Sequence, residues 1–384
     1  MIRLQFLSRT NLSEDYLHSV LISFLRGLAA FEVAAAHLRA QVYPGYSTVA
    51  HPGAAFQALA FFTGFAHQAV VVFFLLSGWL VGGSLLNKRT QQDAMKHYAI
   101  DRVTRLWIVL IPTFVLILAL AALSAQINPL ALSVAASNEF SATAFFGNLV
   151  GLQNIFVAPF GGNFPLWSLS NETWYYALFP LLVAGAGTGP KKTRILAVLA
   201  FAGLAWLLPG PLLLYFMIWL IGVAGSRVKL CGSAAVRWLL LFGFLGAAVY
   251  FRMRGKNDDM GIDSFPQDLL FSILFILWLT STQVRLTRVG VVLASLKRSA
   301  KFFADFSFTL YVIHVPLIKF SSLLLPYLAR SKLVPNNPAH LLVYGTILVV
   351  IIAVAYLFYL PFEANTQRAR MLLKGAALPA RSSA

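Results

Sequence analysis

The stretch Arg26-Gly-Leu-Ala-Ala-Phe-Glu-Val-Ala-Ala-Ala-His37 lies in the first apolar segment of the chain and contains three groups that a membrane span rarely holds. Eleven residues at about 100° each make about three helical turns, so Arg26 and His37 share one face, roughly 16 Å apart along the axis. Glu32 lies well round the helix from that face. Ionisable side chains are costly inside a bilayer. A cation and an imidazole on one face therefore indicate function more strongly than structural hydrogen bonding between helices.

The composition places this stretch in a polytopic membrane protein. The 384 residues are 59% hydrophobic and 11% charged, which is too apolar for the surface of a soluble globule. The formal net charge of +17 is dispersed among apolar segments, so it favours membrane orientation over nucleic acid binding. The single Cys231 excludes an internal disulfide. No metal site is expected, because no two histidines have ligand spacing on one helix.

Apolar runs of about 17–25 residues, bounded by charges, Pro or Gly, predict an all-α helix bundle with about ten transmembrane helices. The predicted helices are 20–38, 67–87, 106–125, 172–187, 193–208, 211–226, 236–251, 267–283, 306–327 and 340–361. The segment 142–158 is less apolar and is interrupted by Gly and Asn. We interpret it as part of a long loop or as a short interfacial helix.

The placement of Lys and Arg predicts the orientation of these helices. With a cytoplasmic N-terminus, cytoplasmic segments hold 22 basic residues and outside segments hold 6, while Arg26 and Lys319 lie within helices. Both termini are then cytoplasmic, as is the loop 88–105, and the long loop 126–171 faces the other side. An eleventh span at 142–158 would invert every later loop and put three basic loops outside.

We therefore expect a single membrane domain over residues 1–384. It has a helical core at 20–361, a short cytoplasmic N-terminal segment and a basic C-terminal tail, and it leaves no room for an appended soluble catalytic domain.

The second predicted helix and the loop that follows it carry suggestive side chains. In the second predicted helix, Ser77 and Gly78 are small residues, and close packing against a neighbouring helix is their favoured role. Arg102 and Arg105 lie on one face of the helical turn that enters the third span. Guanidinium groups can grip phosphate, although orientation alone already requires basic residues there.

The strongest local signal is Pro-Leu-Trp-Ser-Leu-Ser-Asn-Glu-Thr-Trp-Tyr-Tyr at 165–176, the outer entrance to the fourth predicted span. Ser168 or Ser170 can cap this helix, and Glu172 would favour its positive end. The carboxylate of Glu172 also shares the outer membrane boundary with His37. A carboxylate beside an imidazole fixes its tautomer and raises its basicity, so we expect these two residues to act together.

The ninth predicted span begins near Ser307 and contains Tyr311 and His314, which are three residues apart and share one face. An intramembrane histidine requires a partner. A structural and a catalytic role for His314 both stay open at this point.

These motifs together resemble the membrane acyltransferase-3 family, whose members modify bacterial surface glycans. The resemblance extends from residue 20 to about residue 320. The matching motifs are Arg-x10-His at Arg26 and His37, Phe-Phe-x-Leu-Ser-Gly at 73–78, Arg-x-x-Arg at Arg102 and Arg105, Trp-Ser-Leu-x-x-Glu at 167–172 and Ser-x-x-Leu-Tyr-x-x-His-x-Pro at 307–316.

The resemblance implies that acyl-CoA, with acetyl-CoA as the expected form, is the cytoplasmic donor. The acceptor would be a hydroxyl of an extracytoplasmic carbohydrate, such as a surface polysaccharide or a lipopolysaccharide. His37, Glu172 and Arg26 would be catalytic, and Arg102 and Arg105 would hold the donor phosphates. Further site candidates are Ser77, Trp167, Ser168, Ser170, Tyr311 and His314.

The same resemblance implies a multi-pass protein of the bacterial inner membrane, with the lipid bilayer and polysaccharide-assembly machinery as partners. No fused SGNH domain is expected, so the membrane unit would complete the reaction. His37 would either deprotonate the sugar hydroxyl or carry the acyl group as an acyl-imidazole.

The main alternative is a transporter or exporter of a glycan or small molecule, which would also place ionisable residues within helices. A transporter should show two homologous halves, and none are evident. A non-enzymatic assembly partner of a polysaccharide synthase would not need Arg26, His37 and Glu172.

Overall fold

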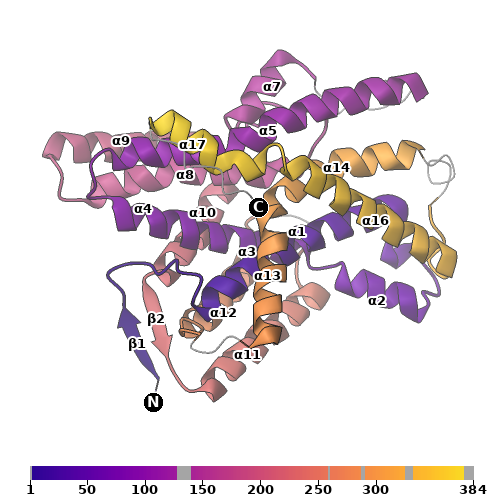
Figure 1. Ribbon diagram of the computed structural model, residues 1–384, viewed down its shortest axis with the longest axis horizontal. Helices are drawn as coiled ribbons and strands as arrows, with labels where there is room; N and C mark the ends of the chain where they lie inside the picture. Colours follow the sequence, from indigo (N-terminus) through magenta and orange to yellow (C-terminus); the bar gives the residue numbers. More distant parts are fainter. Residues whose placement is uncertain (1, 128–139, 258–259, 287–289, 325–331, 376–384) are drawn as a thin grey trace.

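The computed structural model describes residues 2–127, 140–257, 260–286, 290–324 and 332–375. They form a bundle of helices with a two-stranded antiparallel sheet at its periphery, close to the N-terminus (Figure 1). The predicted all-α class is confirmed in these coarse terms.

The long elements are α1 (Leu17–Val42), α3 (Ala66–Ser77), α5 (Ala94–Ile127), α8 (Leu166–Ala186), α9 (Lys191–Leu207), α10 (Gly210–Gly225), α11 (Ala234–Arg254), α12 (Phe265–Ser281), α13 (Val291–Asp305), α14 (Ser307–Leu324) and α16 (Pro338–Tyr359). The shorter elements are β1 (Arg3–Phe6), η1 (Tyr46–Thr48), α2 (Ala54–Phe62), the π-helix η2 (Gly78–Gly82), α4 (Gly83–Lys88), α7 (Ala142–Leu149), β2 (Val228–Cys231), η3 (Glu363–Asn365) and α17 (Thr366–Lys374).

Each of the ten predicted helices overlaps observed helical structure, with 67–87 divided into α3, η2 and α4. Residues 325–327 of the predicted helix 306–327 lie outside the described residues.

Two helices begin well before their predicted starts. α5 begins at Ala94 and α8 at Leu166, because polar residues interrupt the apolar run in the first turns of each helix, as Ser168, Ser170 and Asn171 do in α8. The segment 142–158 begins with the short helix α7 and continues in turns, as expected. Residues 128–139 of the same loop lie outside the described residues.

The number of membrane crossings is supported only in part. Among the described residues, five stretches are long and apolar enough to cross a membrane, and α13 with α14, bent by 52°, would make a sixth. α10 and α12 are apolar but only 16 and 17 residues long. The ten-span count and the cytoplasmic location of both termini therefore remain predictions.

Two glycines let α3 and η2 pack directly on the backbone of α10. A Cβ on Gly78 would lie 1.9 Å from the carbonyl oxygen of Trp219, and one on Gly222 would lie 2.1 Å from that of Leu75. No larger residue fits at either position without moving a helix. The packing role predicted for Gly78 is confirmed.

α1 packs mainly against α13, α14 and α3. Gly27 permits a close approach, because a Cβ there would lie 2.7 Å from the Cβ of Phe303 in α13. The 52° bend between α13 and α14 lets both helices follow α1. As a result, Arg26 contacts Ala304 at the end of α13, and His37 contacts His314 in α14. The fold thereby brings residues about 280 positions apart into one layer.

The predicted orientation can be tested by cysteine labelling in a Cys231→Ala background. We expect a membrane-impermeant maleimide to label Ser47→Cys in intact cells, whereas Gln92→Cys and Thr188→Cys should react only after permeabilisation. All three positions are exposed. Labelling of Thr188→Cys in intact cells would show that α8 does not cross and would contradict the ten-span count.

The packing of α3 on α10 makes a second prediction. Gly78→Ala should lower the stability of the detergent-purified protein by about 1–3 kcal/mol, because the new methyl group overlaps a backbone oxygen. Gly246→Ala in α11 is the matched control, since a Cβ there meets no atom within 4 Å. Thermal unfolding that is equal in the two variants would contradict the packing analysis.

Candidate active site

The imidazoles of His37 on α1 and His314 on α14 form a hydrogen-bonded pair. Nδ1 of His37 lies 2.8 Å from Nε2 of His314, and the two rings are stacked with an interplanar angle of 11°. His314 is fully buried and His37 is half-buried. The sequence identified both residues as candidates but did not pair them.

The second nitrogen of His314 determines which tautomers this pair adopts. Nδ1 of His314 lies 2.7 Å from the carbonyl oxygen of Tyr311, which can only accept, so this nitrogen carries a proton. In a neutral imidazole, Nε2 of His314 is then the acceptor, and Nδ1 of His37 donates to it. The lone pair of His37 is consequently on Nε2, which has no hydrogen-bond partner among the described residues.

A loop between α7 and α8 covers this pair. The ring of Phe164 meets the ring of His37 edge to face at 5.0 Å. The side-chain amide of Asn163 donates to the carbonyl oxygen of Val312 on α14, at 2.9 Å, and the ammonium of Lys319 donates to the carbonyl oxygen of Gly162, at 2.8 Å. Lys319 has no counterpart in the family motifs, and its anchoring of the loop was not foreseen.

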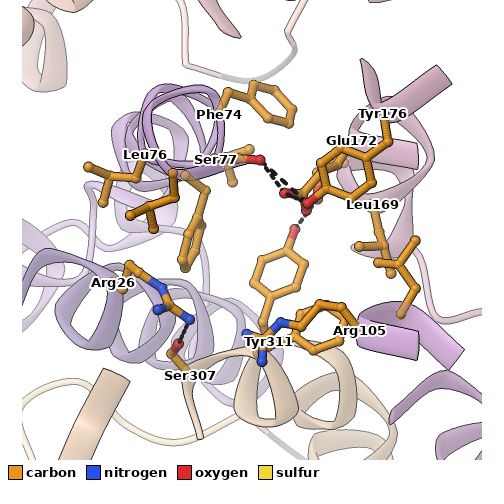
Figure 2. A pocket seen from close by; sticks show the side chains of 16 residues that line it. Arg26, Phe74, Leu76, Ser77, Arg105, Leu169, Glu172, Tyr176, Ser307 and Tyr311 are labelled. Atoms are coloured by element: carbon orange, nitrogen blue, oxygen red, sulfur yellow. Dashed lines mark hydrogen bonds between the residues drawn. The ribbon is translucent and has the colours of Figure 1, made fainter. Parts of the chain in front are cut away.

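A pocket lies between α1, α3, α5, α8 and α14, with Arg26 and Arg105 at one side and Glu172 at the other (Figure 2). The cavity among its side chains has a volume of about 100 Å³, which is below the roughly 300–1,000 Å³ that is typical of drug-sized sites. Its polar lining residues are Arg26, Ser77, Arg105, Ser168, Glu172, Tyr176, Ser307 and Tyr311. We call this the central pocket.

The carboxylate of Glu172 accepts two hydrogen bonds in this pocket. The hydroxyl of Ser77 donates to Oε1 at 2.5 Å, and the hydroxyl of Tyr176 donates to the same oxygen (Figure 2). The indole of Trp219 donates in turn to Oγ of Ser77, at 3.1 Å. Ser77 therefore belongs to the pocket as well as to the packed interface that the sequence favoured for it.

The structure does not form the expected pair between Glu172 and His37. The pairing assumed that Glu172 stands at the outer entrance of its helix, but α8 begins at Leu166, so Glu172 lies about 9 Å further along the axis. Its carboxylate is held by Ser77 and Tyr176, and the partner of His37 is His314. The capping role considered for Ser168 and Ser170 is likewise wrong, because the N-cap is Pro165.

Arg26 and His37 both face α14, as expected for residues on one face of a helix. Nη2 of Arg26 lies 3.5 Å from the carbonyl oxygen of Ala304 and from Oγ of Ser307. Tyr311 lies in α14 between Ser307, which contacts Arg26, and His314, which contacts His37. Its hydroxyl lies 2.6 Å from Oγ of Ser168 and donates to the carbonyl oxygen of Pro165, and its ring lies 5.8 Å from that of His314.

The two arginines predicted to hold phosphates differ, because Arg105 has a carboxylate partner whereas Arg102 contacts aromatic rings. Arg105 forms an ion pair with Glu363 at 2.6 Å and lies over the ring of Phe308. Glu363 is buried and also accepts from the backbone N–H and the hydroxyl of Thr309. Arg102 lies 5.4 Å from the ring centroid of Tyr176. Sequence reasoning missed Glu363, because it follows the last apolar run and carries no motif.

Trp167 and Ser170, which the sequence also offered as site candidates, line a second hollow beside α8. Its polar lining residues are Gln153, Asn154, Trp167, Ser170 and Asn171. The amide nitrogen of Gln153 donates to the carbonyl oxygen of Leu166, whereas its buried Oε1 accepts no hydrogen bond within the described part of the chain. We call this the amide hollow.

The buried carboxylates of Glu32 and Asp268 lie outside the central pocket and the amide hollow, and each accepts hydrogen bonds from other helices or their ends. Oε1 of Glu32 accepts from the backbone N–H of Phe65 at 2.7 Å, which holds the start of α3. Asp268 accepts from His67 at 2.8 Å and from the hydroxyl of Tyr215 at 2.5 Å. In the described ranges, no three His, Cys, Asp or Glu side chains come together as metal ligands.

Apolar helices that enclose a paired imidazole and a pocket lined by half-buried arginines are typical of a multi-pass membrane protein. Residues 21–360 match the family model of an acyltransferase domain. The chain therefore belongs to the acyltransferase-3 family and is a membrane acyltransferase in this general sense. Searches of curated proteins and of solved structures give no match.

The ion pair of the central pocket can be tested by a double-mutant cycle. Arg105→Ala and Glu363→Ala should each destabilise the protein, because the first leaves the buried carboxylate of Glu363 without its partner and the second leaves the half-buried guanidinium of Arg105 without its partner. The double variant should lose less than the sum of the two, by roughly 1–3 kcal/mol, in thermal or denaturant unfolding. Strictly additive losses would show that the pair is not coupled.

Proposed function

We propose that the protein moves an acyl group from cytoplasmic acyl-CoA to a hydroxyl of an extracytoplasmic carbohydrate, as a multi-pass enzyme of a bacterial inner membrane. The observation that carries this proposal is the lone pair on Nε2 of His37, fixed through His314. A neutral imidazole in a defined tautomer suits general-base or nucleophilic catalysis.

The direct reaction needs one proton transfer and one exchange of bonds. Nε2 of His37 takes the proton of the acceptor hydroxyl while the oxygen attacks the thioester carbonyl. The C–S bond then breaks, CoA leaves as the thiolate, and His37 returns the proton to it. In the covalent route, Nε2 itself attacks the carbonyl, the C–S bond breaks and CoA leaves as the thiolate, which gives an acyl-imidazolium. The acceptor oxygen then attacks the acyl carbonyl, the C–N bond breaks to restore neutral His37, and the hydroxyl proton passes to the CoA thiolate. Both routes use the same nitrogen, and both stay open.

The central pocket suits the arm of the donor that leads toward His37, because neither His37 nor His314 is among the residues that line it. Its apolar side chains, among them Phe73, Leu76 and Leu80, can surround an acyl or pantetheine chain. Arg26 lines this pocket on the same face of α1 as His37, but roughly 16 Å away along the axis. We therefore assign its guanidinium to the path of the donor and not to the reacting carbonyl. In this arrangement Glu172 has a positioning role, because it holds Ser77 and Tyr176 on the opposite wall.

A carbohydrate acceptor is supported by the amide hollow. Sugars present many hydroxyls and an apolar ring face, which side-chain amides and an aromatic ring complement. Asn154, Asn171 and Trp167 line the hollow and can supply these contacts. The predicted topology puts this end of α8 outside.

A site within the membrane also explains how a donor on one side can react with an acceptor on the other. CoA carries several negative charges and does not cross a bilayer, whereas a surface glycan is exposed on the other side. An enzyme between the two must pass the acyl group while the nucleotide stays behind. Membership of an acyltransferase family favours this reading over a transporter or exporter.

The proposed role of the histidine pair can be tested with membrane vesicles that contain matched amounts of each variant. His37→Ala should reduce acyl transfer from acetyl-CoA to glycan by about 10²–10⁴-fold, the usual contribution of a general base. His314→Ala should also be strongly impaired, because His37 loses the acceptor that fixes its tautomer. His314→Gln should recover part of the activity, since its amide oxygen can accept from Nδ1 of His37.

The exposed His97 provides the control, and His97→Ala should transfer at the wild-type rate. Full activity in His37→Ala would refute the assignment of the reaction centre. Equal activities of His314→Gln and His314→Ala would show that His314 does not act through its hydrogen bond.

A further inference from the structure

A third concave site lies outside the central pocket, where the N-terminal segment crosses α4 and the end of α10. Its polar lining consists of Ser8, Arg9, Asn87, Arg89, Thr90 and Arg227. We call it the arginine pocket. The predicted topology places all of these residues on the cytoplasmic side, and none of them has a role in the proposed reaction.

The walls of the arginine pocket are held by specific contacts. The side-chain amide of Asn87 makes two hydrogen bonds to the backbone of Thr10, at 2.9 and 3.0 Å. The hydroxyls of Thr10 and Ser226 lie 3.0 Å apart. A Cβ on Gly83 would lie 2.7 Å from Oγ1 of Thr10, so only glycine admits the segment so close to α4. The N-terminal segment is therefore a fixed wall.

The arrangement of charges in this pocket is unfavourable by itself. Nη1 of Arg227 donates to the carbonyl oxygen of Ser8, but Nε and Nη2 are buried without an acceptor among the described residues. Burial lowers the pKa of Arg227, and the neighbouring guanidinium of Arg89 lowers it further. No carboxylate lines the described part of the pocket. Guanidinium groups gathered in this way are stabilised when an anion binds between them.

We propose that the arginine pocket binds the phosphate groups of a ligand through Arg9, Arg89 and Arg227. Guanidinium groups match phosphate with parallel donors, and the hydroxyls of Ser8 and Thr90 can supply further hydrogen bonds. Two sources on the cytoplasmic side carry this chemistry: the nucleotide end of an acyl-CoA and the headgroup of an anionic phospholipid. A nucleotide could also reach the central pocket, since Asn87 lies only about 10 Å beyond Leu80 on the same helical segment.

The test measures binding to the purified full-length protein in nanodiscs of phosphatidylcholine. The first probe is adenosine 3′,5′-bisphosphate, which carries nucleotide phosphates without an acyl arm. The second is phosphatidylglycerol added to the nanodiscs, with retained lipid measured by native mass spectrometry. The variants are Arg9→Gln, Arg89→Gln and Arg227→Gln. Lys88→Gln is the control, because it removes an exposed neighbouring charge that does not line the pocket.

We expect each arginine variant to weaken binding of one of the two probes by about tenfold, and Lys88→Gln to have little effect. The probe that responds identifies the source of the phosphate. Arg9 and Arg89 are exposed, so their variants keep the test valid even if Arg227→Gln releases the N-terminal segment. The proposal would be overturned if the three arginine variants lost no more affinity for either probe than Lys88→Gln does. Because this readout needs no turnover, it stands or falls separately from the proposed acyl transfer.

Discussion

The hydrogen bond from Nδ1 of His314 to the carbonyl oxygen of Tyr311 is the constraint on which the account of the site depends. It fixes the tautomer of a fully buried ring, and that ring in turn fixes the tautomer of His37. The polarity of the pair is thus set by backbone geometry, without a carboxylate. The rest of the fold maintains this contact: the bend between α13 and α14 keeps both helices against α1, and Gly27 lets them approach closely.

Charge compensation organises the interior around this pair. Ionisable groups between membrane helices are costly unless they find partners, and the structure supplies partners from distant segments. Glu363, beyond the last long helix, meets Arg105, and Glu172 accepts from Ser77 and Tyr176. Arg26 has only long contacts, at 3.5 Å, and lines the central pocket. Its guanidinium is the interior cation best placed to respond to a substrate.

Much of the architecture could be predicted from the sequence, but most of the pairing could not. Apolar runs located all ten predicted helices, and helical periodicity put Arg26 and His37 on one face. Polar residues from Ser168 to Thr173 interrupt the apolar run at the start of α8, so Glu172 was placed too near the boundary and assigned to His37. The contacts between His37 and His314, and between Arg105 and Glu363, join residues more than 250 positions apart. Periodicity within one helix carries no information about such partners.

The most direct test of the central claim is the protonation pattern of His37, measured by ¹⁵N NMR of histidine-labelled protein in lipid bilayers. The chain has seven histidines, so the signal of His37 is assigned by its loss in His37→Gln. The account predicts a protonated Nδ1 coupled to His314 and an unprotonated Nε2 at neutral pH. A proton on Nε2 of His37, with Nδ1 bare, would contradict it.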